Sequence, residues 1–331
     1  MSPIRRRQFL IATGALLAAP IASFAQQQGR IWRVGYLGLN RRPASIDSGV
    51  TGALIREMRE LGYVEGKNLV IEWRFADGNS ERLPDLAAEL VRLKVDVLVS
   101  ESSPATSALQ KASPTIPIVM AVSGDPVRSG YVKSLARPGG NITGLSTLFN
   151  EMSAKQLELL LGMLPKLSRV AVLTNPANST HAPFLQNVQS AAQQAGITVL
   201  SVEARTGPEI ENAFPMMIQG KAEALIVVSD ALILMHYRKI AELAAKNRLP
   251  SVSNVRQYVE AGGLISYGPN LEELYRRAAT YVDKIFKGAK PADLPVEQSM
   301  KFELFINNKA AKALGVKIPQ AVLVRADRVI E

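Results

Sequence analysis

The sequence predicts an α/β protein with two doubly wound, Rossmann-like lobes and a ligand cleft between them. Short runs rich in Val, Ile and Leu alternate with helical stretches, which is typical of a parallel sheet covered by helices on both faces. This alternation runs to residue 146 and then starts again. The chain has 331 residues, enough for two domains of about 150 residues each, so we assign one lobe to each series.

The first series begins with the strand RVGYLG at residues 33–38. The helix predicted at 48–62 has apolar residues at helical spacing, Leu54 and Met58 among them, and ends in Gly62, a residue type that often terminates helices. The other elements of this series are a helix at 81–94 and strands at 68–76, 95–100, 116–122 and 141–146.

The second series follows a predicted crossing between the lobes at residues 146–151. Its helices are expected at 153–165, 182–195 and 231–247, and its strands at 169–175, 197–204, 224–230, 249–254 and 262–268. The sequence after Gly268 is too short for a third domain, so we expect helix 271–288 to return to the first lobe. The chain is expected to cross again near residues 297–307. The first lobe then contains residues 30–146 and about 269–298, and the second contains 147–268 and about 299–331.

The first 25 residues predict a cleaved signal peptide. Arginines at 5–7 precede a mildly apolar run at 9–24, and the small residues Ser23 and Ala25 fit a signal-peptidase site. The run is too short and too weakly apolar for a spanning helix, which needs about 20 strongly apolar residues. We therefore expect cleavage near Ala25 and a mature protein in the periplasm.

The residues around the arginines predict the export route. RRQFL at 6–10 fits the twin-arginine pattern R-R-x-F-L. Arg5 stands where Ser or Thr is usual, and Ile11 stands where Lys is common. Twin-arginine export of the folded protein is the hypothesis, and the general secretory route is the alternative.

Composition and motifs argue against several function classes. The chain has no cysteine, which excludes a disulfide framework, a thiolate nucleophile and cysteine metal sites. Its formal charge is +10, but the basic residues are scattered and do not interleave with aromatic residues as in nucleic-acid binders. The dinucleotide-binding, nucleophile-elbow and H-E-x-x-H motifs are missing. We therefore expect a monomer that binds a small molecule, with no metal, no cofactor and no nucleic-acid partner.

Candidate ligand contacts follow the strands of the first lobe, because ligands of open α/β sheets bind beyond the carboxyl ends of strands. Ser102, Ser103 and Thr106 lie at a predicted helix start after the third strand, with Ser103 as the expected N-cap. Hydroxyls and free amides at such a helix start suit a ligand carboxylate, and a purely structural cap is the alternative. Ser123 and Gly124 follow the fourth strand, where glycine lets the backbone approach a ligand closely.

The second lobe offers its own candidates after its strands. Asn175 and Asn178 lie in a turn rich in hydrogen-bonding side chains. Asp230 ends one strand and begins a helix, where a carboxylate either caps the helix or receives a ligand ammonium group. Tyr267, after another strand, is expected to form an apolar wall of the cleft.

Five stretches of the chain resemble one family. They are residues 61–99, 124–146, which read GDPVRSGYVKSLARPGGNITGLS, 169–178, 241–250 and 260–315. The family is that of ABC-transport substrate-binding proteins, which includes tryptophan and aromatic-amino-acid binders. The resemblance implies a type I periplasmic-binding fold, capture of an amino-acid-like or aromatic carboxylate ligand by lobe closure, and delivery to an ABC permease in the inner membrane. By position it also implies that Ser102, Ser103, Thr106 and Ser123 hold the ligand carboxylate and Asp230 its ammonium group.

Two other functions stay open. A periplasmic sensor that reports ligand occupancy to a membrane receptor would need the same fold and the same cleft. An exported α/β enzyme is the more remote alternative, because the sequence lacks the signatures of a nucleophile, a metal site or a cofactor site.

Overall fold

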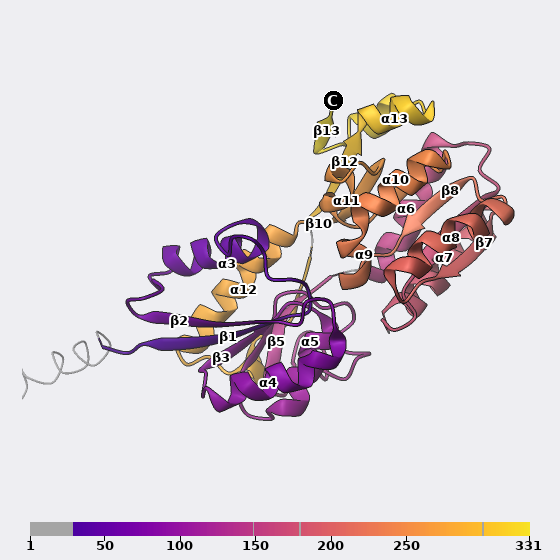
Figure 1. The fold of residues 1–331 in the computed structure, drawn as a ribbon. Coiled ribbons are helices and arrows are strands. Elements are labelled where there is room, and N and C mark those ends of the chain that lie inside the picture. The colour runs from indigo at the N-terminus through magenta and orange to yellow at the C-terminus, as the bar shows by residue number, and fades with distance from the viewer. Residues whose placement is uncertain (1–28, 148, 179, 300) are drawn as a thin grey trace, which may run out of the picture.

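Two sheets, each covered by helices, form two lobes (Figure 1), which confirms the predicted fold class. The computed structural model describes residues 29–147, 149–178, 180–299 and 301–331. The predicted signal peptide at 1–25 lies outside these residues, and so does Leu148 in the predicted first crossing. The part of the chain that is described holds no helix with the length and apolar character of a membrane span.

The first sheet contains, within the described residues, six parallel strands in the order β11-β5-β4-β3-β1-β2. The strands are β1 (Trp32–Gly38), β2 (Leu69–Phe75), β3 (Val97–Ser100), β4 (Ile118–Met120), β5 (Ile142–Ser146) and β11 (Glu297–Gln298). Helices α3 (Gly49–Glu60) and α12 (Leu271–Phe286) cover one face, and α4 (Leu83–Arg92) and α5 (Ser103–Ala112) cover the other (Figure 1). Short 3₁₀ turns lie at Ser80–Arg82 and Pro291–Asp293.

Alternation along the strands explains why both faces of each sheet are apolar. In β1, Tyr36 packs among the residues of α3 and α12, and the next residue, Leu37, packs among those of α4 and α5. In the second lobe, Val172 and Leu173 likewise belong to cores on opposite faces. A strand buried on both faces is apolar at nearly every position, as the sequence predicts for these runs.

The second sheet contains, over the same described ranges, seven strands in the order β13-β12-β10-β9-β8-β6-β7. The strands are β6 (Arg169–Thr174), β7 (Thr198–Glu203), β8 (Ala224–Val227), β9 (Ser251–Ser253), β10 (Ile265–Pro269), β12 (Phe302–Asn307) and β13 (Arg328–Ile330). Strand β12 runs antiparallel to β10, whereas a wholly parallel sheet is the sequence prediction. The antiparallel pairing follows from the route of the chain, because β12 enters this sheet from the other lobe.

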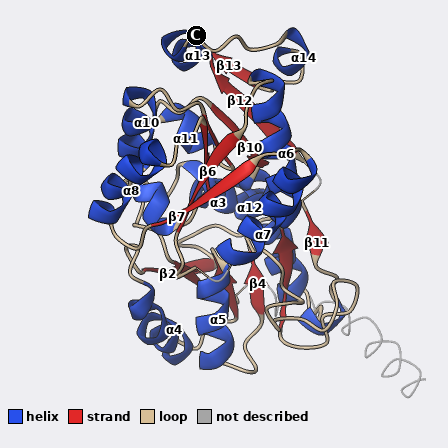
Figure 2. Ribbon diagram, turned by 90° about the vertical axis from the view of Figure 1, so that its right-hand side faces the viewer, coloured by secondary structure: helices blue, strands red, loops and turns tan. Residues whose placement is uncertain are grey.

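Helices from two groups cover the second sheet. Figure 2 shows α6 and α7 on one side of the sheet and α8 and α10 on the other. The first group is α6 (Phe149–Met163), α7 (His181–Gln194), α13 (Asn308–Leu314) and α14 (Gln320–Leu323). The second group is α8 (Gly207–Gln219), α9 (Ala231–Met235), α10 (Tyr237–Lys246) and α11 (Arg256–Glu260).

Along the described residues, the chain passes between the lobes three times (Figure 1). The passages lie between β5 and α6, between β10 and α12, and between β11 and β12. Helix α12 belongs to the core of the first lobe, where Phe286 stacks on Trp32 with 4.2 Å between ring centroids. Glu297 of β11 pairs with Leu145 of β5. The carboxyl ends of the first-sheet strands and of β6, β8, β9 and β10 face the space between the lobes, whereas those of β12 and β13 point away from it.

Three local predictions are wrong. The helix predicted at 231–247 is two helices, because the backbone of His236 (φ −108°, ψ 9°) leaves the helical range. The His236 ring packs on Gly207, where a Cβ atom would lie 2.7 Å from the imidazole. The N-cap of α5 is Ser102 instead of Ser103, since the Ser102 hydroxyl accepts the hydrogen bond from the Ala105 amide. Helix α8 is absent from the sequence prediction and carries Pro215 in its interior, a residue that argues against a helix.

Candidate functional site

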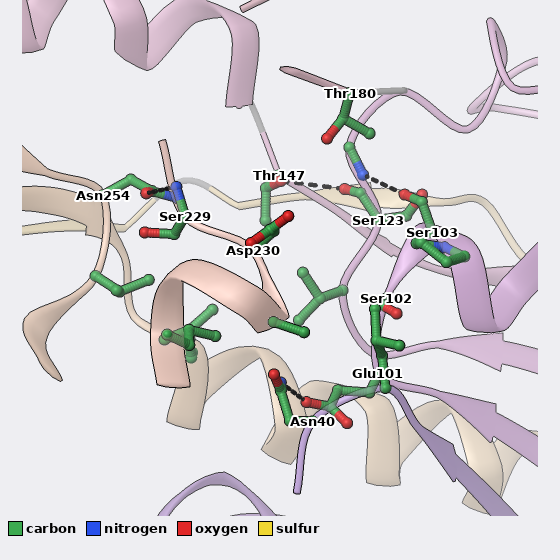
Figure 3. Close-up of a pocket in the computed structure, with 18 of the residues that line it drawn as sticks. Asn40, Glu101, Ser102, Ser103, Ser123, Thr147, Thr180, Ser229, Asp230 and Asn254 are labelled. Carbon is green, nitrogen blue, oxygen red and sulfur yellow. Dashed lines mark hydrogen bonds between the residues drawn. The ribbon is translucent and has the colours of Figure 1, made fainter. Parts of the chain in front are cut away.

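A cavity of about 230 Å³ lies between the lobes, at the carboxyl ends of strands from both sheets (Figure 3). It is larger than the cavity of about 150 Å³ that holds benzene in another protein, so it has room for a ligand with an aromatic ring. The first lobe contributes residues that follow β1, β3 and β4, together with parts of α3 and α12. The second lobe contributes residues that follow β6, β8 and β9 and the end of β10.

The predicted hydroxyl cluster lies on the first-lobe wall. Ser102, Ser103, Ser123 and Gly124 all line the cavity. The Ser103 hydroxyl accepts a hydrogen bond from the Gly124 amide at 3.3 Å, and its own proton is free to donate. The Ser123 hydroxyl is buried without a hydrogen-bond partner in the described chain. This wall therefore has two hydroxyls whose protons are not donated within the described chain, and their contact with a ligand carboxylate stays a prediction.

The second-lobe wall holds Asp230 and Asn178, which also line the cavity. Asp230 is the N-cap of α9, because one carboxylate oxygen accepts from the Ile233 amide at 2.9 Å. Its other oxygen accepts from the Asn175 side-chain amide at 2.6 Å. Asp230 is thus a helix cap that also lines the cavity, and its contact with a ligand stays a prediction.

A buried histidine, His181, lies next to the Asn175–Asp230 pair. Its Nδ1 atom accepts a hydrogen bond from the Asn175 backbone amide at 2.9 Å. Burial lowers the pKa of His181, and the nearby Asp230 carboxylate partly opposes that shift. The ring is therefore neutral at pH 7 and carries its proton on Nε2. Asn175 and His181 hold the carboxylate in place without adding a positive charge beside it.

Three predicted site residues do not line the cavity. Thr106 is fully buried, and its hydroxyl bonds to that of Ser100 at 2.7 Å. Asn175 points its amide at Asp230 from outside the cavity wall. Tyr267 stacks on Phe302, with 5.7 Å between ring centroids, and packs on the core of the second lobe.

Several polar residues of the cavity wall are missing from the prediction, among them Asn40, Glu101, Thr180 and Asn254. Asn40 lies two residues after β1, Glu101 directly follows β3, and the Asn40 side-chain amide donates to the Glu101 carboxylate. Asn254 follows β9 and accepts from the Ser229 amide at 3.2 Å. Thr180 faces Gly124 across the cavity, where a Cβ atom at position 124 would lie 3.6 Å from the Thr180 methyl group. Their place after a strand is the sequence signal that could have marked Asn40, Glu101 and Asn254.

The Glu101 carboxyl group has a raised pKa and an incomplete set of hydrogen bonds. Burial raises its pKa to about 7, against hydrogen bonds from Asn40 that lower it. One of its oxygens has no hydrogen-bond partner among the described residues. No group of three or more His, Cys, Asp or Glu side chains in the described ranges could hold a metal ion.

Comparison with known proteins gives concordant results. Residues 44–330 match the sequence model of a family described as ABC transporter substrate binding protein. A tyrosine-binding protein of Clostridioides difficile (strain R20291) is 28% identical over 273 residues, which are 82% of this chain and 78% of that protein. The fold also resembles that of a conserved domain protein from Vibrio cholerae, with a TM-score of 0.85 and 29% identity over 91% of this chain and 100% of that one.

A second similar structure contains a bound amino acid. It is an ABC domain from Streptococcus pneumoniae in complex with L-Trp, with a TM-score of 0.82 and 26% identity. The alignment covers 91% of this chain and 100% of that chain. The likeness to these structures extends over both lobes and therefore includes the cleft between them.

Proposed function

Because the chain belongs to the family of ABC transporter substrate-binding proteins, we propose that it captures an amino-acid-like or aromatic carboxylate ligand between its lobes and delivers it to an ABC importer. The chain is accordingly a binding protein and not an enzyme. One observation carries the proposal: polar groups from both lobes, Ser103 and Ser123 on one wall and Asp230 on the other, line a single cavity. The ligands named for the relatives, tyrosine and L-Trp, fit this chemistry.

Lobe closure is the proposed mechanism. A ligand that touches both walls binds the closed arrangement better than the open one, and only this difference in affinity drives closure. The Ser103 and Ser123 hydroxyls donate to the ligand carboxylate, and Asp230 accepts from the ammonium group across the cavity. The proposed lobes are residues 30–146 with about 269–298 and residues 147–268 with about 299–331. The closed form is then the one that docks on the permease.

Substitutions on the two walls test the proposal. We expect Ser103→Ala to weaken binding of an L-amino acid about 10–100-fold, since a hydrogen bond to a charged carboxylate contributes about 1.5–3 kcal/mol. Asp230→Asn keeps a side chain able to cap α9 and removes the charge, so binding of the zwitterion should weaken about 10–100-fold. Isothermal titration calorimetry measures both, after a thermal-shift screen of L-amino acids and aromatic acids identifies a ligand.

Two controls separate binding from folding. Ser190→Ala removes a hydroxyl on the exposed side of α7 that bonds only to the Gln186 carbonyl, and it should leave the affinity unchanged. The desamino acid of the same ligand should lose little affinity in Asp230→Asn. If both wall variants fold normally and bind as tightly as the parent, the proposed site is wrong.

Export through a twin-arginine signal is the proposed route to the periplasm. Arg6→Lys combined with Arg7→Lys should leave the precursor uncleaved in the cytoplasm, because lysine keeps the charge and removes the guanidinium groups. Fractionation and immunoblotting measure the distribution. Arg5→Lys alone is the matched control and should be exported normally. Normal export of the double variant would favour the general secretory route instead.

A further inference from the structure

Unpartnered polar atoms are concentrated in residues that line the cavity. Among the described residues, five buried side-chain polar atoms lack a hydrogen-bond partner, and three of them belong to residues that line the cavity. Two of the three are Asn40 Oδ1 and Glu101 Oε2. A buried polar atom left without a partner is unfavourable, so this clustering points to a ligand group that completes the hydrogen bonds.

When Glu101 is ionised, the free atoms of these two residues are acceptors only. The Asn40 side-chain amide already donates to Glu101 Oε1, and Asn40 Oδ1 and Glu101 Oε2 are buried beside the cavity without a hydrogen-bond partner in the described chain. The other groups that act on Glu101 are the Leu39 backbone amide and the phenols of Tyr36 and Tyr275, none of which is positively charged. The two phenol oxygens lie 3.2 Å apart and bond to each other. The carboxyl group of Glu101 therefore has no cationic partner in the described chain.

The second carboxylate of the cavity differs from Glu101. Both oxygens of Asp230 already accept hydrogen bonds, from the Ile233 amide and from the Asn175 side chain. Figure 3 places the Asn40 and Glu101 side chains together on one side of the cavity and Ser103, Ser123 and Thr180 on the other, with Asp230 between them. Apolar side chains such as Leu39, Val50 and Leu271 line the rest of the cavity. The described residues that line it include no Lys, Arg or His.

Building on the proposed function, we propose that Asn40 and Glu101 together bind a positively charged nitrogen of the ligand, at the end opposite the ligand carboxylate. A cation supplies both the donors that the two oxygens lack and the charge that a buried carboxylate needs. A second carboxylate at this end would be repelled, and an apolar end would leave both oxygens without partners. The ligand is thus a cationic amino acid or an aromatic amino acid bearing an amine or guanidine.

Release of a proton on binding is a second expected property of this cation site. In the empty cavity burial raises the pKa of Glu101 to about 7, so a large fraction carries a proton at pH 6. A bound cation favours the ionised carboxylate, so its binding at pH 6 releases a proton. Tyr36 and Tyr275 do not compete in this range, because burial raises the pKa of both phenols above their usual value.

Matched ligand pairs test the inference. The pairs are L-lysine with L-norleucine, L-arginine with L-citrulline, and 4-aminomethyl-L-phenylalanine with 4-methyl-L-phenylalanine. Calorimetry at pH 7.5 should show that the charged member of the best-fitting pair binds at least about tenfold more tightly, as for a charge-assisted hydrogen bond. At pH 6, titrations in buffers of different ionisation enthalpy should show proton release for the charged member alone.

Glu101→Gln is the decisive variant. It should bring the affinity ratio within each pair close to one and abolish proton release, while the uncharged member keeps its affinity. Glu60→Gln makes the same change on the exposed end of α3 and should alter neither quantity. Equal or tighter binding of the uncharged members by the parent, or an unchanged ratio in Glu101→Gln, overturns the inference and leaves the proposed function standing. If no member of any pair binds, the proposed amino-acid ligand is wrong and the inference fails with it.

Discussion

Glu101→Gln is expected to raise the free energy of unfolding at pH 8 by about 2–3 kcal/mol in the absence of ligand. The pKa of Glu101 is about 7 in the folded chain against an ordinary value of 4.5. Each unit of difference corresponds to about 1.4 kcal/mol, which would give about 3.4 kcal/mol before allowing for water in the cavity. Glutamine presents the same oxygen to Asn40 without a charge to bury. The stabilisation is large for one substitution at a cavity wall.

The stabilisation by Glu101→Gln depends on pH because the pKa of Glu101 is higher in the folded than in the unfolded state. Between about pH 4.5 and pH 7 the folded state binds more protons at Glu101 than the unfolded state does, so its contribution to stability falls as pH rises. The advantage of Glu101→Gln should consequently be small at pH 5 and complete by pH 8. Thermal and urea unfolding of both proteins at these two pH values measure the difference.

A second titrating group does not disturb this comparison. Burial lowers the pKa of His181, so its contribution to stability falls as pH drops, opposite to that of Glu101. Because His181 is present in both proteins, it cancels when the variant is compared with the parent at each pH. Equal unfolding free energies of Glu101→Gln and the parent at pH 8 would contradict the burial of an uncompensated carboxyl group.

The cost of keeping Glu101 in the empty protein has a functional interpretation. Residues that disfavour the folded state are retained where binding needs them, and the partner that relieves them then contributes more to affinity. The free oxygens of Asn40 and Glu101 have this character, whereas Asp230 is already satisfied by the protein itself. The two carboxylates of the cavity therefore differ: Asp230 also caps a helix and accepts two hydrogen bonds from the protein, whereas Glu101 has no charged partner in the described chain.

The sheets could be predicted because a strand buried on both faces is a short run of residues that is apolar at nearly every position. Every residue of β3 is buried, and its short apolar run cannot be mistaken for an amphipathic helix. The route of the chain after β10 was harder to predict. Strand β12 reads like any other strand, and only its entry from the first lobe makes it antiparallel to β10.

The sequence predicts which strand ends surround the cavity, but not which of the side chains that follow them line it. Ser102, Ser103 and Thr106 follow the same strand, yet Thr106 turns inward to Ser100 and leaves the cavity wall. Which of several neighbouring polar side chains faces the ligand depends on partners distant in the sequence. Glu101 illustrates this, because its significance comes from Asn40, 61 residues away, and from the absence of a cation near both in the described chain.

Gly268→Ala is expected to lower the stability of the second lobe by about 3 kcal/mol, near the upper end of the range for overpacking. Gly268 lies in β10 opposite Glu303, and a Cβ atom there would lie 1.7 Å from the Asn254 carbonyl oxygen. Because that oxygen belongs to the backbone, it cannot move aside as a flexible side chain could. Relief requires the turn after β9 to shift, and Asn254 would carry its cavity-lining side chain with it.

Gly124→Ala is the matched control, because a Cβ atom at this second cleft glycine meets only the Thr180 methyl group at an ordinary 3.6 Å. The melting temperature of Gly268→Ala should fall by roughly 5–10 °C and that of Gly124→Ala by no more than about 2 °C. Hydrogen exchange should accelerate in β9 and β10 of Gly268→Ala and stay unchanged in β1 and β3, since those strands belong to the other sheet. Equal melting temperatures for the two variants would mean that the turn at Asn254 yields freely, and Asn254 could not then hold a fixed place in the cavity wall.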